Sequence, residues 1–192
     1  PRKFITTGEG GVVATNNKKW ADWINSYKHF GMDMTGANRE GIHFNIIGTN
    51  YKLTNIQAAV GLGQLENIDE LLNKRIQLAN NYKKLIKNFN KINLPIVLDP
   101  KLNCQHSFQT YIVYIDDRDR VMSEMRNKGI EVQIGSYALH MHKAFNSNSQ
   151  IEIIGDLKNS KWCFNHALAL PLYNDLTFEL QEVIINELNS CL

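Results

Sequence analysis

The longest regular pattern in the sequence is a stripe of apolar residues between Ile68 and Ile86. Its members recur every three or four residues: Ile68, Leu71, Leu72, Ile76, Ala79, Tyr82 and Ile86. Residues at this spacing lie on one face of an α-helix. On the polar side, Glu70 and Lys74 are four residues apart and form a favourable pair. The pattern therefore predicts a long helix with one buried face.

A glycine-rich turn opens the segment before this helix. Thr6–Gly11 reads Thr-Thr-Gly-Glu-Gly-Gly, and the apolar residues of Val12–Thr15 predict a short strand after it. Asn16 or Asn17 is placed to cap the helix that follows, which ends at Gly31. This part of the chain is expected to contain a turn, a strand and a helix in that order.

A long irregular stretch, 31–50, separates that helix from the next one. Loops of this length inside a compact domain are usually functional or mobile. Thr54 and Gln57 then have the spacing of a capping box, which predicts that a helix begins at this point.

The character of the sequence changes after Pro95. Thr110–Ile115 is rich in β-branched and aromatic residues, and Ile130–Ile134 alternates apolar and polar residues, so both predict strands. One helix is predicted between them, beginning at Asp116 or Asp117 and ending at Gly129. Another is predicted at the end of the chain. The last helix begins at Thr177 and is expected to bury Leu180, Val183, Ile184 and Leu188. The best boundary between domains lies near 88–95, at the end of the long helix, and divides the chain into residues 1–90 and 91–192.

Composition excludes several classes of function. The formal net charge is only +2, and the basic residues are scattered, which argues against nucleic-acid binding. No apolar stretch approaches the ~20 residues that cross a bilayer, and no leader sequence is recognisable. The three cysteines are widely spaced, which argues against a disulfide framework and against a zinc site and favours a reducing cytoplasm: Cys104, Cys163 and Cys191.

Lys3 stands just before the glycine-rich turn. A lysine in this position is either an ordinary surface residue or one that is held in place for chemistry. An amine condenses with an aldehyde cofactor, and such an amine has to be fixed by a rigid element. A lysine at a strand end, backed by a tight turn, satisfies that requirement.

Four blocks of the sequence together resemble one family. Pro1–Val13 is similar to the segment around the cofactor lysine of the DegT/DnrJ/StrS family of sugar aminotransferases. Gly48–Ala59 resembles the family's G-x-N-x-[RK] segment and the helix after it, which Gln64-Leu65 continues. Gln133–His140 and Ala169–Thr177 resemble two later loops. The blocks occur in the order of the family and extend over the whole chain.

The resemblance implies the C-terminal part of a type I, aspartate aminotransferase-like fold, with the rest of a large domain in 1–90 and a small α/β domain in 91–192. It implies the cofactor pyridoxal 5'-phosphate (PLP), with Lys3 as its covalent attachment point and, once displaced, as the general base. Asn50 would reach the PLP phosphate of the partner subunit, so the resemblance implies a homodimer with shared active sites. Lys52 occupies a position where the family often has arginine, which keeps the charge but loses bidentate geometry.

The same resemblance implies three substrate-side residues. Tyr137 and His140 would contact sugar or nucleotide, and His43 would face the site across the dimer. His140 and His142 are two residues apart, but no carboxylate or thiol pattern accompanies them, so no metal site is expected.

The implied reaction transfers an amino group from glutamate to a nucleotide-diphosphate keto-sugar. The groups that contact the PLP ring and most of its phosphate would lie before Lys3, outside this chain, so the chain alone is expected to be inactive. Two alternatives remain at this point: a PLP-dependent sugar dehydratase, and a non-catalytic regulatory or assembly module of the same fold.

Overall fold

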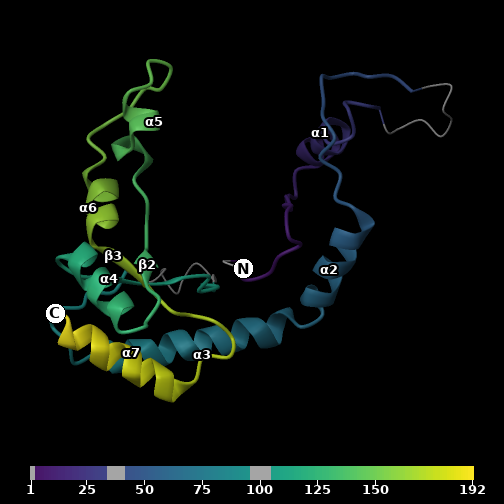
Figure 1. Cartoon of the computed structure of the whole chain (residues 1–192). Coiled ribbons are helices and arrows are strands. Elements are labelled where there is room, and N and C mark those ends of the chain that lie inside the picture. Colours follow the sequence, from purple (N-terminus) through teal and green to yellow (C-terminus); the bar gives the residue numbers. More distant parts are fainter. Residues whose placement is uncertain (1–2, 34–41, 96–104) are drawn as a thin grey trace. The chain divides into compact units, whose positions relative to one another are not determined.

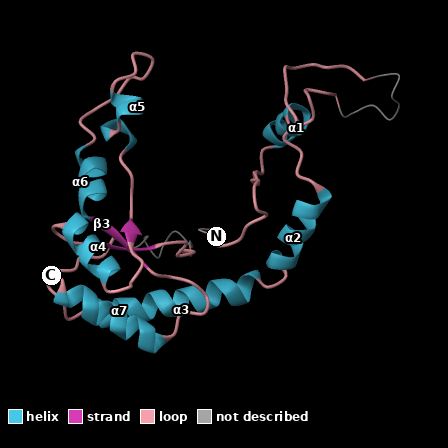
Figure 2. Ribbon diagram, viewed as in Figure 1, coloured by secondary structure: helices cyan, strands magenta, loops and turns pink. Residues whose placement is uncertain are grey.

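The computed structural model describes residues 3–33, 42–95 and 105–192. By its internal contacts the chain forms two compact units, Pro1–Asn67 and Ile68–Leu192, and each is described here by itself. Helices α1 and α2 belong to the first unit, and all strands of the described residues belong to the second (Figures 1 and 2). In the described part of the chain, no helix is both long and apolar enough to cross a membrane.

Both helices of the first unit begin at the caps that the sequence predicts. In α1 (Lys18–Tyr27), the side chain of Asn17 accepts hydrogen bonds from the backbone N–H groups of Lys19 and Trp20. In α2 (Asn55–Leu65), Thr54 and Gln57 form the reciprocal capping box. Each cap satisfies N–H groups that have no partner within the helix, which fixes where the helix starts.

Backbone hydrogen bonds hold the segment before α2 against the end of α1. The N–H of Thr49 donates to the carbonyl of Tyr27 at 2.9 Å, and the N–H of Tyr51 donates to Lys28 at 3.0 Å. Gly31 has a φ of 81°, and a Cβ added to Gly48 would lie 2.2 Å from the Gly31 nitrogen. Only a residue without a side chain allows this approach.

The first unit buries little of its apolar surface. No residue of α1 or α2 is buried. The predicted strand over Val12–Thr15 is wrong for this structure: the segment is irregular, and the Val12 side chain is 89% exposed. A strand requires a hydrogen-bonded neighbour, and the described residues provide none for this segment.

The second unit is built on a three-stranded antiparallel sheet with the strand order β1-β3-β2. The central strand, β3 (Ala167–Leu170), pairs with β1 (Tyr111–Tyr114) and with β2 (Gln133–Ile134). The sheet confirms the predicted strand near 110–115, whereas the strand predicted over 130–134 pairs only at its last two residues.

The helices of the second unit surround this sheet. Helix α3 (Ile68–Ile86) packs on α7 (Phe178–Ser190), and α4 (Arg118–Asn127) packs on β3, α6 and α7. Short helical segments fill the long connection from β2 to β3: a 3₁₀ helix at Leu139–Met141, α5 (Lys143–Asn146) and α6 (Lys158–His166). Helix α4 ends where predicted, because Gly129 adopts a φ of 79° and lets the N–H of Ile130 reach the carbonyl of Met125 at 3.0 Å.

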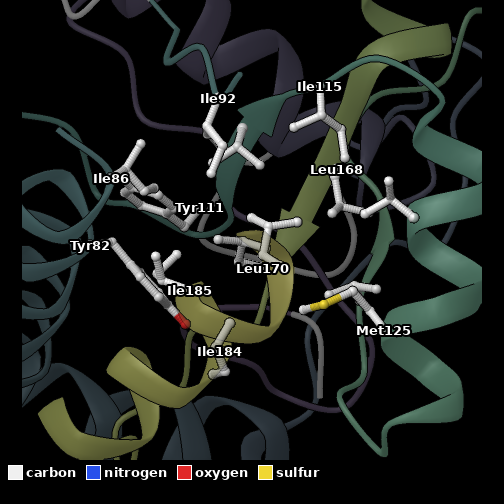
Figure 3. Packing of buried hydrophobic residues seen from close by; sticks show 14 of the residues in the cluster. Tyr82, Ile86, Ile92, Tyr111, Ile115, Met125, Leu168, Leu170, Ile184 and Ile185 are labelled. Atoms are coloured by element: carbon white, nitrogen blue, oxygen red, sulfur yellow. The ribbon is translucent and has the colours of Figure 1, made fainter. Parts of the chain in front are cut away.

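The hydrophobic core lies between α3, α7, α4 and the sheet (Figure 3). The rings of Tyr82 in α3 and Tyr111 in β1 lie there at a tilt of 32° with their centroids 4.9 Å apart. Burial raises the pKa of both phenols above the ordinary value. The Tyr82 hydroxyl is not left unpaired, because it donates to the carbonyl of Pro171 at 2.9 Å.

Helix α7 buries a face one residue away from the predicted one. Ile184 and Leu188 are buried as expected, whereas Leu180 and Val183 are 46% and 51% exposed. The buried positions instead include Gln181, whose amide donates to the carbonyl of Leu78 at 2.9 Å. The prediction counted only apolar residues and therefore left out Gln181, so the predicted face of α7 was displaced from the buried one.

The division of the chain into two compact units falls between Asn67 and Ile68, at the start of α3. The buried face of α3 packs on α7, so the helix is part of the second unit. The division into 1–90 and 91–192 concerned the domains of a larger enzyme, and it stays a prediction.

Candidate functional site

Lys3 is the first described residue and its side chain is exposed. Its amine forms no hydrogen bond or ion pair with any described residue. A free, exposed amine is what covalent attachment of an aldehyde cofactor requires, so the residue fits the role. The residues that follow it, from Phe4 to Thr7, are partly buried.

The glycine-rich turn after Lys3 is held by its own side chains. The Thr7 hydroxyl donates to the carbonyl of Glu9 at 2.8 Å, and the N–H of Gly8 donates to the Thr6 hydroxyl at 3.1 Å. Gly8 and Gly10 have φ values of 85° and 141°, in the region that favours glycine. Both threonines, Gly8 and Gly10 therefore each have a local structural reason.

Helix α2 holds the same turn from outside. The Gln64 side chain accepts a hydrogen bond from the N–H of Thr6 at 2.9 Å and donates to the Thr6 carbonyl. Gln57 donates to the carbonyl of Glu9 at 2.8 Å. Between the two glutamines on this face, a Cβ added to Gly61 would lie 3.3 Å from the Thr7 methyl group, so the helix and the turn approach closely.

Asn50 lies in the segment that is bonded to the end of α1. It pairs with His29 in an isolated antiparallel bridge, and its side chain is exposed. Two residues on, the Lys52 ammonium lies 4.2 Å from the centre of the Phe30 ring, a cation–π distance. The amide of Asn50 is thus presented to solvent by a fixed backbone, four residues before the cap of α2.

His43 lies at the edge of the undescribed part of the long loop. Its backbone carbonyl accepts a hydrogen bond from the N–H of Asp33 at 2.8 Å, and its side chain is exposed.

An open cavity of about 890 Å³ lies in the first unit. The turn, the C-terminal half of α1 and the segment before α2 line it: Glu9–Val13, Thr15, Ala21, Ile24, Asn25, Tyr27, Lys28, Tyr51–Leu53 and Gln57. Neither Lys3 nor Asn50 is among these residues.

Tyr137 and His140 belong to the second unit. Tyr137 is 59% exposed, and its ring lies 6.2 Å from the rings of both His142 and Phe164. His140 is partly buried within the 3₁₀ helix and makes no ring contact with a described residue. The structure thus associates Tyr137 with His142, not with His140.

The His142 ring is the part of this cluster that the sequence did not single out. It meets the Phe164 ring edge-on, with the ring centroids 5.5 Å apart. The Cζ atom of Arg118 lies over the same Phe164 ring, 5.5 Å from its centroid. The Nε2 atom of His142 is buried and has no hydrogen-bond partner among the described residues. Within that part of the chain, no three histidine, cysteine or acidic side chains are grouped as a metal site would require.

The last motif, Ala169–Thr177, is fixed by residues of α3. Arg75 donates from Nε to the carbonyl of Phe108 at 3.0 Å and from Nη2 to the carbonyls of Gln109 and Leu172 at 2.8 and 3.3 Å. Burial lowers the pKa of Arg75. Thr177 caps α7 by accepting the N–H of Leu180 at 3.3 Å.

Sequence reasoning missed the role of the two glutamines. Gln57 was identified as half of a capping box and Gln64 as part of a motif, but neither was assigned to the turn. One signal was available: the two residues are seven apart and thus lie on one face of a helix whose other residues are mostly apolar.

Comparison with known proteins identifies the family of the chain. Residues 1–189 match the model of the DegT/DnrJ/EryC1/StrS aminotransferase family. A GDP-perosamine synthase from Caulobacter vibrioides is 35% identical over 181 residues, which is 91% of this chain and 46% of that protein. A dTDP-4-amino-4,6-dideoxy-D-glucose transaminase from Shigella dysenteriae is 28% identical over 188 residues, 96% of this chain and 48% of that protein.

Solved structures show the same fold. An aminotransferase from Psychrobacter cryohalolentis superposes with a TM-score of 0.84 at 21% identity, over 97% of this chain and 52% of that one. A Helicobacter pylori aminotransferase involved in the biosynthesis of pseudoaminic acid gives a TM-score of 0.82 at 22% identity, over 98% and 50%. These matches confirm the predicted α/β fold class of a type I aminotransferase.

The chain spans about half the length of the relatives that it matches. The family match nevertheless extends over nearly all of its residues, including the lysine segment, the Asn50 segment and both later loops. The chain belongs to the DegT/DnrJ/EryC1/StrS aminotransferase family.

Proposed function

We propose that this chain is one half of a PLP-dependent enzyme that transfers an amino group from glutamate to the ketone of a nucleotide-linked sugar. One observation carries the proposal: an exposed lysine with no ion-pair partner among the described residues precedes a turn that α2 holds through side-chain amides. The names of the curated relatives, which include a perosamine synthase and an aminosugar transaminase, support the class of substrate.

Lys3 is the residue to which we assign the cofactor. PLP, when bound, withdraws electrons from the amino-acid substrate, which lets an amino group pass between two carbon skeletons. The contribution of this chain is to hold the cofactor aldehyde at the Lys3 Nζ atom. Once the substrate has displaced Lys3 from the cofactor, the same nitrogen acts as the base that moves a proton of the substrate.

Asn50 is assigned to the cofactor phosphate of the partner subunit. An amide offers two N–H donors, which suit a phosphate oxygen. The side chain is exposed on a backbone fixed against α1, and the positive end of α2 follows within a few residues. This assignment requires a homodimer in which each active site is shared.

Tyr137, His140 and His43 are proposed to contact the sugar nucleotide. The side chains of Tyr137 and His43 are exposed and that of His140 is partly buried, and the rings of His142 and Phe164 lie beside Tyr137. We place the enzyme in the cytoplasm, which suits the wide spacing of its cysteines.

Chemical labelling of the complete enzyme that contains this chain tests the lysine. Borohydride reduction in the presence of PLP, followed by peptide mapping, is expected to place the pyridoxyl group on Lys3. Lys3→Ala should abolish turnover, whereas Lys19→Ala, which removes an exposed lysine of α1, should retain it. A label on another lysine would disprove the assignment.

Mixing of subunits tests the shared site. Lys3→Ala and Asn50→Ala enzymes are each expected to be inactive or weak, and losing one donor to a phosphate costs about 1.5–3 kcal/mol, or roughly ten- to more than a hundredfold in PLP affinity. If Asn50 acts on the partner's cofactor, a heterodimer contains one site with both defects and one intact site, so activity returns. If heterodimers form and no activity returns, Asn50 acts within its own subunit.

Glutamate and the sugar product test the reaction class. A transaminase discharges the PLP absorbance band on addition of glutamate and yields an amino sugar. A dehydratase yields a deoxy sugar, and a non-catalytic module shows neither change.

A further inference from the structure

Helix α2 turns a polar face to the lysine segment and leaves its apolar side chains exposed. Its less exposed residues are Gln57, Ala58, Gly61 and Gln64, whereas Ile56, Val60, Leu62 and Leu65 are all exposed. Hydrophobic packing therefore does not explain how α2 associates with the turn within this unit. Side-chain amides and a glycine provide that contact.

The Gln64 side chain binds both the N–H and the carbonyl of the Thr6 backbone. Its Oε1 accepts the Thr6 N–H at 2.9 Å, and its Nε2 donates to the Thr6 carbonyl and, at 3.1 Å, to the carbonyl of Val60. A neighbouring strand would pair with a residue in the same way. The amide thus fixes the position of Thr6 along α2, and a slip of one residue would break both bonds.

Gln57 fixes the other end of the turn. Its Nε2 donates to the Glu9 carbonyl at 2.8 Å, while its Oε1 accepts the Thr54 N–H at 3.1 Å. One side chain therefore connects the cap of α2 to the turn. With the turn held at Thr6 and Glu9, the three residues back to Lys3 reach at most about 10 Å from a fixed point.

We propose that Gln64 is a positioning residue for Lys3: its carboxamide sets the register of the Thr6 backbone on α2 and so directs the Lys3 amine, with Gln57 closing the far end of the turn. The inference rests on the proposed function, because it concerns how the reactive lysine is held. It assigns Gln64 no contact with cofactor or substrate.

Replacement by leucine is the first test, made in the complete enzyme. Gln64→Leu removes the donor and the acceptor and leaves the helix propensity nearly unchanged. In the cofactor-free protein, exchange of the Thr6 amide hydrogen should become about tenfold faster or more, because its partner is lost. In the PLP-bound enzyme, kcat should fall at least about tenfold while KM for the sugar changes less than about twofold, since substrate groups are untouched.

Gln77→Leu is the matched control, because Gln77 is an exposed glutamine of α3 whose side chain forms no hydrogen bond with the described residues. It should leave Thr6 exchange and kcat unchanged. Wild-type Thr6 exchange and wild-type kcat in Gln64→Leu would overturn the inference.

Gln64→Glu keeps the inference testable if the leucine variant fails to fold. A carboxylate accepts the Thr6 N–H but cannot donate to the Thr6 carbonyl, whereas a protonated carboxyl group does both. The Thr6 carbonyl raises the pKa of such a group and the Thr6 N–H lowers it, so the titration has to be followed through the ordinary value of ~4.3. Protection of Thr6, measured against Gln77→Leu at each pH, should therefore recover as the pH is lowered from 7 to about 3.5, and a pH-independent ratio over this range would contradict the register role.

The two proposals fail in different ways. If Lys3 is labelled by PLP and borohydride at the wild-type rate in Gln64→Leu, the positioning role is wrong and the function stands. If Thr6 exchange responds to Gln64→Leu but the label lies on another lysine, Gln64 does hold the Thr6 backbone and the assignment of Lys3 is wrong. The positioning role is then wrong as well.

Discussion

Replacing Arg75 by methionine is expected to destabilise the second unit and to free the segment Ala169–Thr177 from α3. Arg75 is 7% exposed, and its guanidinium donates to the carbonyls of Phe108, Gln109 and Leu172. Methionine has a similar length and packs in the same space but donates nothing. The variant therefore removes the hydrogen bonds and keeps most of the apolar contact.

The magnitude follows from these three bonds. A hydrogen bond from a charged donor contributes about 1.5–3 kcal/mol, so the sum sets an upper bound of roughly 5–9 kcal/mol. Two effects reduce it. Gln109 is an exposed residue, so its carbonyl can bind water, and removing a buried charge recovers the desolvation that lowers the Arg75 pKa. We expect a loss of about 2–4 kcal/mol in the free energy of unfolding.

Urea unfolding followed by tryptophan fluorescence measures this loss. Trp20 and Trp23 lie in the first unit and Trp162 in the second, so a Trp20→Phe, Trp23→Phe background makes Trp162 the reporter of the second unit. The midpoint should fall by roughly 1–2 M urea with an unchanged slope.

Lys83→Met provides the control, because it removes an exposed cation from the same helix and should change the free energy of unfolding by less than about 0.5 kcal/mol. Equal midpoints for Arg75→Met and Lys83→Met would refute the reasoning. The carbonyls would then be satisfied by water, and the arginine would contribute no net stability.

Three further predictions concern the backbone, the surface charges and the isolated chain. Gly48→Ala should weaken PLP binding in the complete enzyme, measured by titration of the PLP absorbance band, because a Cβ at this position would lie 2.2 Å from the Gly31 nitrogen; Gly63→Ala, with nothing within 4 Å, should not. The Lys128 ammonium lowers the pKa of Glu187. This pair therefore contributes stability above the unfolded-state pKa of Glu187 and loses it as the pH falls through the folded-state value. The Lys128→Gln variant should show a smaller fall in urea midpoint between pH 5 and pH 3 than the unaltered chain. The 192-residue chain alone is expected to bind PLP weakly, since it spans about half of its relatives, and a stoichiometric chromophore that glutamate discharges would contradict this.

Local chemistry made much of the fold predictable from the sequence. The caps at Asn17 and Thr54 and the glycine at 129 act within a few residues of their own position, so their effect can be inferred without the rest of the chain. The long stripe of α3 was predictable for the same reason. Features that depend on distant partners were not: Val12–Thr15 has strand-forming residues but no described neighbour, and α7 buries Gln181 because Leu78 offers it a carbonyl.

In the candidate site, too, features set by neighbouring residues could be predicted and features that depend on distant partners could not. Lys3 was identified from a motif, and its assignment as the cofactor lysine stays a prediction. The hydrogen bonds from Gln64 to Thr6 join residues 58 positions apart, and no local pattern reports such a pair. The grouping of Tyr137 with His142 and Phe164 depends on α6, which the sequence pattern did not predict.

The strand order β1-β3-β2 has a consequence for how the chain folds as it is synthesised. The central strand is the last of the three in the sequence, so β1 and β2 leave the ribosome without the partner that both need. The core stays open until Ile184, Ile185 and Leu188 of α7 have also emerged. Pairings over such long separations form slowly, and unpaired strand edges are prone to aggregation meanwhile. Slow translation of the segment between β1 and β3 would prolong this exposed state, which makes that interval the one in which a chaperone would matter most.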